Sequence, residues 1–179
     1  RAHFSAKEIE LRVDANGAFS PDDALNKLQR LAVLDLHSIE QPIKQHQWPK
    51  LAELCRETPL PIALDEELIG VNVRSMKQAL LDTIRPQYIV LKPSLHGGMY
   101  GCEEWISLAR ERGIGSWITS ALESNVGLNA IAHFCAKVYG EEAYGAEAPM
   151  AQGLGTGKLF EDNLPSQLEI RGEKLFFLP

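Results

Sequence analysis

Four charged side chains, each directly after a short apolar segment, are the residues whose types and spacing favour chemistry. They succeed one another at intervals of 26, 25 and 27 positions. Such a regular interval is typical of a repeated strand–helix unit, because crossover helices between parallel strands bring the carboxyl ends of all the strands to one edge. We therefore expect one rim to carry Asp14 after segment 9–13, Glu40 after 36–39, Asp65 after 61–64 and Lys92 after 88–91.

Three carboxylates on one rim predict a metal ion. Oxygen-only ligands with no cysteine beside them favour a hard divalent cation, with Mg²⁺ first and Mn²⁺ as the alternative. Without a cation, the carboxylates would repel one another and raise each other's pKa. A single charged residue at a strand end is more often a solvated rim residue or a helix N-cap. Several such residues at equivalent strand ends favour a functional site. Lys92 would add acid–base or electrostatic chemistry.

The segments between these residues carry helical signals. Ser20 and Pro21 form an N-cap and first-turn pair, and apolar residues recur at helical spacing after them. Similar patterns predict helices over about 48–56, 73–84, 100–112 and 128–139. Lys7 is expected at the end of a helix that leads into the strand near Ile9. The short runs between helices are rich in Ile, Val and Leu, as buried parallel strands require.

A partial (β/α)8 barrel is the α/β architecture that this alternation predicts. A complete barrel takes about 250 residues, roughly 31 for each unit, so the 179 residues fit about six units. We assign residues 1–149 to the partial barrel. Residues 150–179 begin with a Gly-rich loop and then alternate around Gly172, which predicts a C-terminal hairpin. An open arc of strands would expose two edges, so we expect association into oligomers.

Several motifs resemble barrel segments of the enolase superfamily, in its muconate-lactonizing branch. The third to sixth barrel strands are similar to VDANGAF at 13–19, IEQP at 39–42, ALDEE at 63–67 and VLKPS at 90–94. The seventh-strand and post-eighth-strand segments of o-succinylbenzoate synthases are similar to ITSALESNVG at 118–127 and GLGTGKLF at 153–160. The resemblance implies six units corresponding to strands three to eight, Mg²⁺ held by Asp14, Glu40 and Asp65, and Lys92 on one side of a small carboxylate substrate.

The resemblance also implies a reaction. It is the magnesium-dependent dehydration of a succinyl hydroxycyclohexadiene carboxylate to o-succinylbenzoate in menaquinone biosynthesis, a syn elimination of water through an enediolate. Segment 116–120 has no His, unlike mandelate-racemase-like sites, and segment 143–147 lacks the Asp-x-Asp pattern of dipeptide epimerases. N-acyl amino acid racemisation, or a related reaction of the superfamily, stays open as an alternative. A further alternative is that these residues alone form a non-catalytic partial barrel.

Two parts of the superfamily pattern are not found in these 179 residues. One is the Lys-x-Lys pair of the second barrel strand, which supplies the principal base in the family. The other is the N-terminal capping domain, which closes over the site. We therefore expect the chain to be the C-terminal part of a longer enzyme, with its hairpin packing toward that capping domain.

Six more residues are candidates for contacts with the metal site or the substrate, each with a plainer structural alternative. Asn16 and Glu66 are either supporting partners of the metal ligands or loop caps. Ser120 and Glu123 either contact the substrate or are N-caps of the next helix. Gly97 and Gly98, next to His96, form either an anion cradle or a plain turn.

Composition limits the other classes of function. A net charge of −6 disfavours a nucleic-acid surface, and no apolar run reaches the roughly 20 residues that a bilayer requires. Hydrophobic residues make up 45% of the chain and charged residues 23%, as in ordinary globular proteins. Cys55, Cys102 and Cys135 are widely spaced and are expected to be buried, reduced thiols, which favours the cytoplasm.

Overall fold

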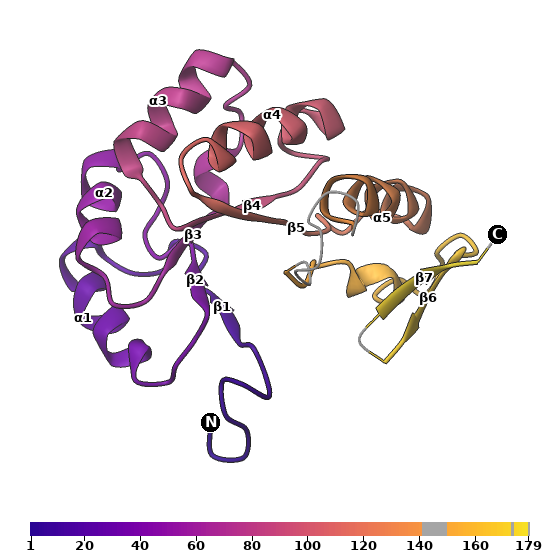
Figure 1. Cartoon of the computed structure of the whole chain (residues 1–179), viewed down its shortest axis with the longest axis horizontal. Coiled ribbons are helices and arrows are strands. Elements are labelled where there is room, and N and C mark those ends of the chain that lie inside the picture. Colours follow the sequence, from indigo (N-terminus) through magenta and orange to yellow (C-terminus); the bar gives the residue numbers. More distant parts are fainter. Residues whose placement is uncertain (141–149, 173, 179) are drawn as a thin grey trace. The chain divides into compact units, whose positions relative to one another are not determined.

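The computed structural model describes residues 1–140, 150–172 and 174–178, and among them five strands form one sheet (Figure 1). Neighbouring strands follow the order of the sequence, and the pairs from β1 to β4 are parallel. The strands are three or four residues long: β1 (Arg12–Asp14), β2 (Ser38–Glu40), β3 (Ile62–Leu64), β4 (Tyr88–Leu91) and β5 (Gly115–Ile118). A parallel sheet in sequence order confirms the predicted α/β repeat.

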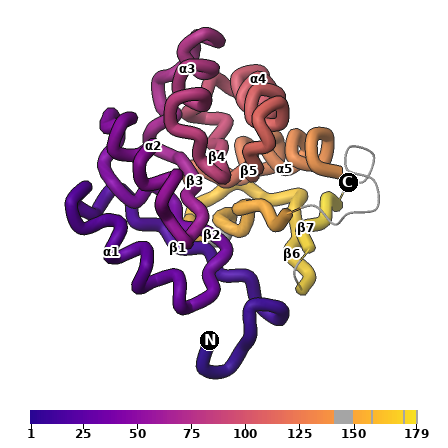
Figure 2. Tube along the Cα trace, turned by 60° about the vertical axis from the view of Figure 1, so that its left-hand side comes forward, coloured from indigo at the N-terminus to yellow at the C-terminus, as the bar shows by residue number. Residues whose placement is uncertain are grey.

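A helix follows each of these strands. The helices are α1 (Pro21–Ala32), α2 (Trp48–Glu57), α3 (Arg74–Ile84), α4 (Gly98–Arg110) and α5 (Asn125–Tyr139), with short 3₁₀ turns η1 (Glu66–Leu68) and η2 (Gly155–Lys158). The bounds of α2 to α5 agree with the predicted segments to within about three residues, and α1 begins at the predicted Pro21. Helices α1, α2 and α3 pack side by side along the strands (Figure 2). The crossover helices thus leave the carboxyl ends of β1, β2 and β3 at one edge.

The chain divides into two compact units, and each is described by itself. The first comprises residues 1–90 and 105–116, and the second residues 91–104 and 117–179. In the first unit, β3 is buried along its whole length, and Leu28, Leu51 and Leu80 of the helices are fully buried. Fully burying a leucine side chain stabilises the fold by about 2 kcal/mol. Packing of these short strands therefore depends on the helices that cover them.

Helix α1 begins as the sequence predicts, but its cap differs in detail. Ser20 is the N-cap residue and Pro21 occupies the first turn, while the Ser20 side chain makes no cap hydrogen bond. Asp22 and Asp23 place two negative charges in the first turn, where the positive end of the helix dipole favours them. The start of α1 is therefore stabilised by charge and by the fixed proline backbone instead of the serine hydroxyl.

The predicted helix around Lys7 is wrong. Residues 6–8 form a turn, and β1 begins only at Arg12. The carboxylate of Glu8 accepts hydrogen bonds from the amide and the hydroxyl of Ser5, at 2.9 and 2.7 Å. This local pairing satisfies the polar groups of a single turn, so the segment does not continue as a helix.

The predicted C-terminal hairpin is confirmed. Strands β6 (Leu168–Arg171) and β7 (Lys174–Phe177) pair antiparallel on either side of Gly172. The sixth strand of the predicted barrel, near residues 143–147, lies outside the described residues. Just beyond that segment, Gly153 pairs with the end of β5, donating its amide to Ile118 and accepting one from Ser120.

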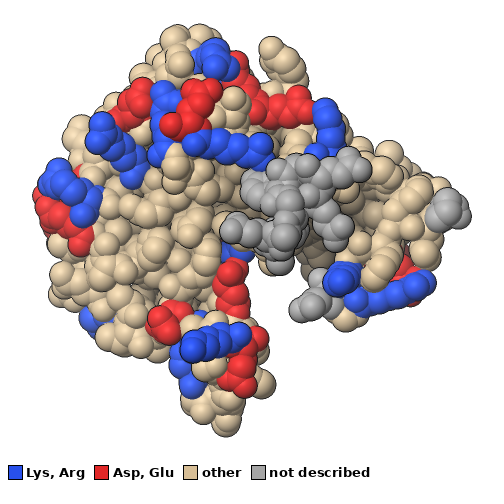
Figure 3. All heavy atoms as spheres, in the orientation of Figure 1, with Lys and Arg blue, Asp and Glu red and all other residues tan. Residues whose placement is uncertain are grey.

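Charged side chains on the face drawn in Figure 3 are mixed in sign, with lysines and arginines lying next to aspartates and glutamates. The ion pairs of the chain include Arg112 with Asp82, at 2.8 Å, and Lys50 with Glu53, at 3.4 Å. Within the described part of the chain, none of the helices is long and apolar enough to cross a membrane.

Candidate active site

Three predicted metal ligands lie at neighbouring strand ends of the first unit. Asp14 is the last residue of β1 and pairs in register with Glu40, the last residue of β2. Glu40 in turn pairs with Ala63 of β3, so Asp65 lies two residues further along that strand. The backbone therefore brings the three carboxylate-bearing positions to one edge, as their spacing in the sequence predicts.

The three carboxylates differ in their surroundings. Asp65 is 1% exposed, Glu40 is half-buried and Asp14 is exposed. Asp14 Oδ1 accepts the backbone amide of Asn16 at 2.8 Å, which closes a tight turn after β1. Asn16 itself has a left-handed backbone with φ 45° and an exposed side chain. The Asn16 amide thus holds the Asp14 carboxylate in the turn, and the role of Asn16 beside a metal site stays a prediction.

The fit of these residues to a cation depends on donor chemistry and register. All three offer carboxylate oxygens, the donors that Mg²⁺ takes in proteins, and one of them is buried at the strand edge. In the residues that the structure describes, no three His, Cys, Asp or Glu side chains form a group ready to hold a metal ion. The strand ends are therefore adjacent, whereas their side chains are not closed around a common point.

Close packing of two loops fixes the first pair of strand ends. Gly17, after β1, donates its amide to the carbonyl of Gln41, after β2, at 2.7 Å. Its φ is +69°, and a Cβ there would lie 3.0 Å from the Cα of Lys44. Only glycine meets both requirements without strain, so the two loops can touch backbone to backbone.

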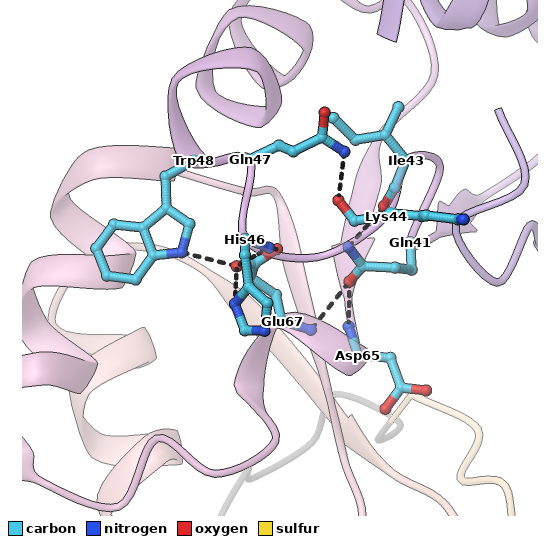
Figure 4. Close-up of polar contacts among 8 residues, drawn as sticks. All are labelled: Gln41, Ile43, Lys44, His46, Gln47, Trp48, Asp65 and Glu67. Carbon is cyan, nitrogen blue, oxygen red and sulfur yellow. Dashed lines mark hydrogen bonds and ion pairs between the residues drawn. The ribbon is translucent and has the colours of Figure 1, made fainter. Parts of the chain in front are cut away.

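Two buried polar residues of this unit, Gln41 and Glu67, were not predicted from the sequence (Figure 4). Gln41 is 0% exposed, and its Oε1 accepts the amides of Asp65 and Glu67 at 3.2 and 3.3 Å. The buried carboxylate of Glu67 accepts the Trp48 indole N–H at 2.7 Å and the His46 amide at 3.0 Å. The sequence contains no local signal for these contacts, because Gln41 meets Asp65 and Glu67 only once the strands are paired.

Glu66 begins the turn η1 directly after Asp65, and its side chain is half-buried. Asp65 leaves β3 with φ −126° and ψ −81°, and its carbonyl accepts the amide of Leu68 at 2.9 Å. The turn therefore bends the backbone at once after the strand. The predicted supporting role of Glu66 stays a prediction.

Lys92 follows β4 directly, in the second unit, and His96 holds its backbone at both polar atoms. The Lys92 amide donates to His96 Nδ1 at 2.9 Å, and the Lys92 carbonyl accepts the His96 amide at 3.0 Å. His96 is 0% exposed, and because Nδ1 accepts, the neutral ring carries its proton on Nε2. Lys92 is thus fixed at the strand end while its side chain stays half-buried.

The glycines after His96 lie in the same turn. Gly97 and Gly98 have φ +84° and +72°, and the Gly98 amide donates to the carbonyl of Pro93 at 3.0 Å. The amides of His96 and Gly98 therefore serve the turn itself. These contacts fit the plain turn, and the anion cradle at Gly97 and Gly98 stays a prediction.

Replacing His96 by Leu should speed hydrogen exchange of the Lys92 amide by about fivefold, because it removes a hydrogen bond worth about 1 kcal/mol. His96→Asn, which keeps an acceptor near the position of Nδ1, should restore most of the protection. NMR exchange measurements would follow the Lys92 amide in both variants. His133→Leu is the control, since His133 Nδ1 bonds the Asn129 carbonyl of its own helix and its ring packs edge-on against Phe177. Equal rates in wild type and His96→Leu would contradict the assignment.

Ser120 and Glu123 belong to a hydrogen-bonded cluster in the loops after β4 and β5. The Glu123 carboxylate accepts the hydroxyls of Ser120 at 2.6 Å and Ser94 at 2.5 Å, and the amide of Ala121 at 2.9 Å. Partial burial by itself raises the pKa of Glu123, but these hydrogen bonds outweigh it, so the pKa lies below its ordinary value. Ser124, not Glu123, is the N-cap residue of α5, so the N-cap alternative for these two residues is wrong.

The chain resembles one protein family along almost its whole length. A family model described as enolase C-terminal domain-like matches residues 1–174. The o-succinylbenzoate synthase of Desulfotalea psychrophila is 58% identical over 172 residues, which are 96% of this chain and 44% of that protein. The L-Ala-D/L-Glu epimerase of Bacillus subtilis is 28% identical over 146 residues, which are 79% of this chain and 38% of that protein. The chain thus spans less than half the length of these curated relatives.

A solved structure gives the same result. The crystal structure of MenC from Desulfotalea psychrophila matches with a TM-score of 0.89 at 58% identity, covering 98% of this chain and 47% of that chain. A TM-score this high means that the order of strands and helices found here is retained in that crystal structure.

Proposed function

Because the chain belongs to the enolase C-terminal domain-like family, we propose that the protein carrying it is a magnesium-dependent o-succinylbenzoate synthase. The observation that supports this most directly is the 58% identity to a synthase over 96% of the chain. The reaction is the loss of water from a succinyl hydroxycyclohexadiene carboxylate, initiated by removal of the proton next to its carboxylate. That proton is weakly acidic, so the protein must stabilise the negative charge that develops.

Asp14, Glu40 and Asp65 are the residues that would hold the cation. When bound, Mg²⁺ supplies positive charge against the developing negative charge of the substrate carboxylate. The burial of Asp65 supports this role, because a buried carboxylate at a strand end is stabilised by a nearby positive charge. The amide of Asn16 on Asp14 and the amide oxygen of Gln41 on the Asp65 backbone orient two of the ligands.

Lys92 is the residue that we assign to the reacting part of the substrate. Its ammonium group stabilises the anion that forms when the proton leaves, and its position is fixed by the contacts of His96 with its backbone. The Lys-x-Lys pair to which the resemblance gives the principal base does not occur in these 179 residues. We therefore expect turnover only in the full-length protein, and none from this stretch alone.

A parallel assay of two substrates tests the proposal. Full-length protein would be given the cyclohexadiene carboxylate and, separately, an N-acyl amino acid, with Mg²⁺ or with a chelator. We expect o-succinylbenzoate to form in a metal-dependent reaction whose kcat/KM exceeds that of racemisation. Faster racemisation would favour the related racemase function instead, and formation of neither product would refute both.

We place the protein in the cytoplasm on the evidence of its thiols. Cys55 and Cys135 are buried, free thiols, and Cys102 is buried as well. Burial raises the pKa of Cys55 and Cys135 to about 12, which leaves both thiols protonated and unreactive at neutral pH. Reduced, unpaired cysteines are typical of reducing compartments.

A further inference from the structure

Gln41 joins the three loops that follow β1, β2 and β3, and every polar group of this residue takes part. Its amide donates to the carbonyl of Ala63 in β3 at 2.9 Å, and its carbonyl accepts the amide of Gly17 at 2.7 Å. In the side chain, Nε2 donates to the carbonyl of Ile43 at 2.9 Å, while Oε1 accepts the amides of Asp65 and Glu67. One buried residue thus connects the ends of three strands.

The position of Gln41 in the chain makes these contacts relevant to the metal site. Gln41 directly follows Glu40, and its Oε1 accepts the backbone amide of Asp65 (Figure 4), so it is connected to two of the proposed ligands. The Asp65 carboxylate points away from Gln41. The glutamine therefore holds Asp65 through its backbone amide.

The backbone of Gln41 is in an unusual conformation. Its φ is +36°, in the left-handed region that residues other than glycine seldom adopt. Such a conformation persists only where surrounding contacts enforce it, and it is concentrated at functional sites. The strain and the complete use of its polar groups both indicate that this side chain has a specific task.

We propose that Gln41 is a positioning residue that sets the separation of the Glu40 and Asp65 backbones, so that only their side chains have to move when a cation binds. The inference rests on the proposed magnesium site. Outer partners of metal ligands typically change metal affinity by about 10- to 100-fold when they are removed. Glu67 extends the same connection, because its backbone binds Gln41 and its carboxylate holds the loop at His46 and Trp48.

Gln41→Met tests the proposal, since methionine has a similar volume and forms none of the three side-chain hydrogen bonds of Gln41. We expect the Kd for Mg²⁺, measured by calorimetry on the full-length protein, to rise about 10- to 100-fold. Gln41→Asn, whose shorter side chain withdraws the acceptor, should weaken binding in the same direction and serves if the methionine variant does not fold. Gln47→Met is the matched control, because Gln47 in the same loop donates only to the Lys44 carbonyl and should leave the Kd unchanged.

Amide hydrogen exchange supplies a reading that needs no metal. Exchange of the Asp65 and Glu67 amides should be faster in Gln41→Met than in wild type, and unchanged in Gln47→Met. If Gln41→Met binds Mg²⁺ as wild type does, while Asp65→Asn does not, the positioning role is refuted and the proposed function stands. If Asp65→Asn also binds Mg²⁺ normally, the proposed metal site itself is wrong.

Discussion

Replacing Asp65 by Asn is expected to weaken Mg²⁺ binding by at least about 100-fold, since loss of an outer partner alone already costs up to that factor. The change keeps the shape of a side chain that is 1% exposed and removes its charge. Turnover of the full-length protein should fall by about 10³-fold, because the positive charge facing the substrate carboxylate is lost. Calorimetric titration with Mg²⁺ and steady-state assays would measure the two effects.

The control for this variant is Asp22→Asn, which removes an exposed carboxylate from the first turn of α1. It should alter neither the Kd for Mg²⁺ nor kcat. Melting curves of both variants would separate loss of metal from loss of fold. An Asp65→Asn protein with wild-type affinity and rate would remove Asp65 from the site.

The second large effect is expected from Lys92→Ala. Loss of the side chain should lower kcat by about 10³-fold, within the range for a residue that assists proton transfer or stabilises the resulting anion. The Kd for Mg²⁺ should change little, because Lys92 is not one of the proposed ligands. Steady-state kinetics with saturating Mg²⁺ would separate kcat from KM.

Lys92→Arg distinguishes the two ways in which the lysine can act. Arginine keeps the positive charge but does not release a proton at working pH. If charge is the main contribution, as we propose, Lys92→Arg should retain clearly more activity than Lys92→Ala. Equal losses in both variants would instead assign proton transfer to Lys92. Lys50→Ala, on an exposed lysine of α2, is the control. A Lys92→Ala enzyme that is no slower than this control would contradict the catalytic role.

Local patterns in the sequence were sufficient for the order of the elements and for the strand-end positions. Buried parallel strands and amphipathic helices have different periods, so their alternation places Asp14, Glu40, Asp65 and Lys92 after four successive strands. The turn at Lys7 was missed because Ser5 and Glu8 satisfy each other locally, which a helical pattern does not reveal. Single-turn structures depend on individual hydrogen bonds more than on periodicity.

The contacts that orient the site could not be predicted in the same way. Gln41 and Glu67 are 26 positions apart, and Glu67 lies 19 positions from Trp48, so each contact requires the strands to be paired first. His96 is only four positions from Lys92, yet its role depends on the left-handed glycines that turn the chain back. A polar residue in an apolar setting is visible in a sequence, but its partner becomes known only from the fold.

The hydrogen bonds of the rim tie its loops into two sets, and this has a consequence for how such a protein can diversify. Gly17, Gln41 and Glu67 join the loops after β1, β2 and β3, which carry the acidic residues. Ser94 and Glu123 join the loops after β4 and β5 to each other. An insertion in any of the first three loops would disturb its tied neighbours, whereas paired changes at Ser94 and Glu123 leave those bonds intact. We therefore expect the second set of loops to tolerate changes of sequence more readily than the first.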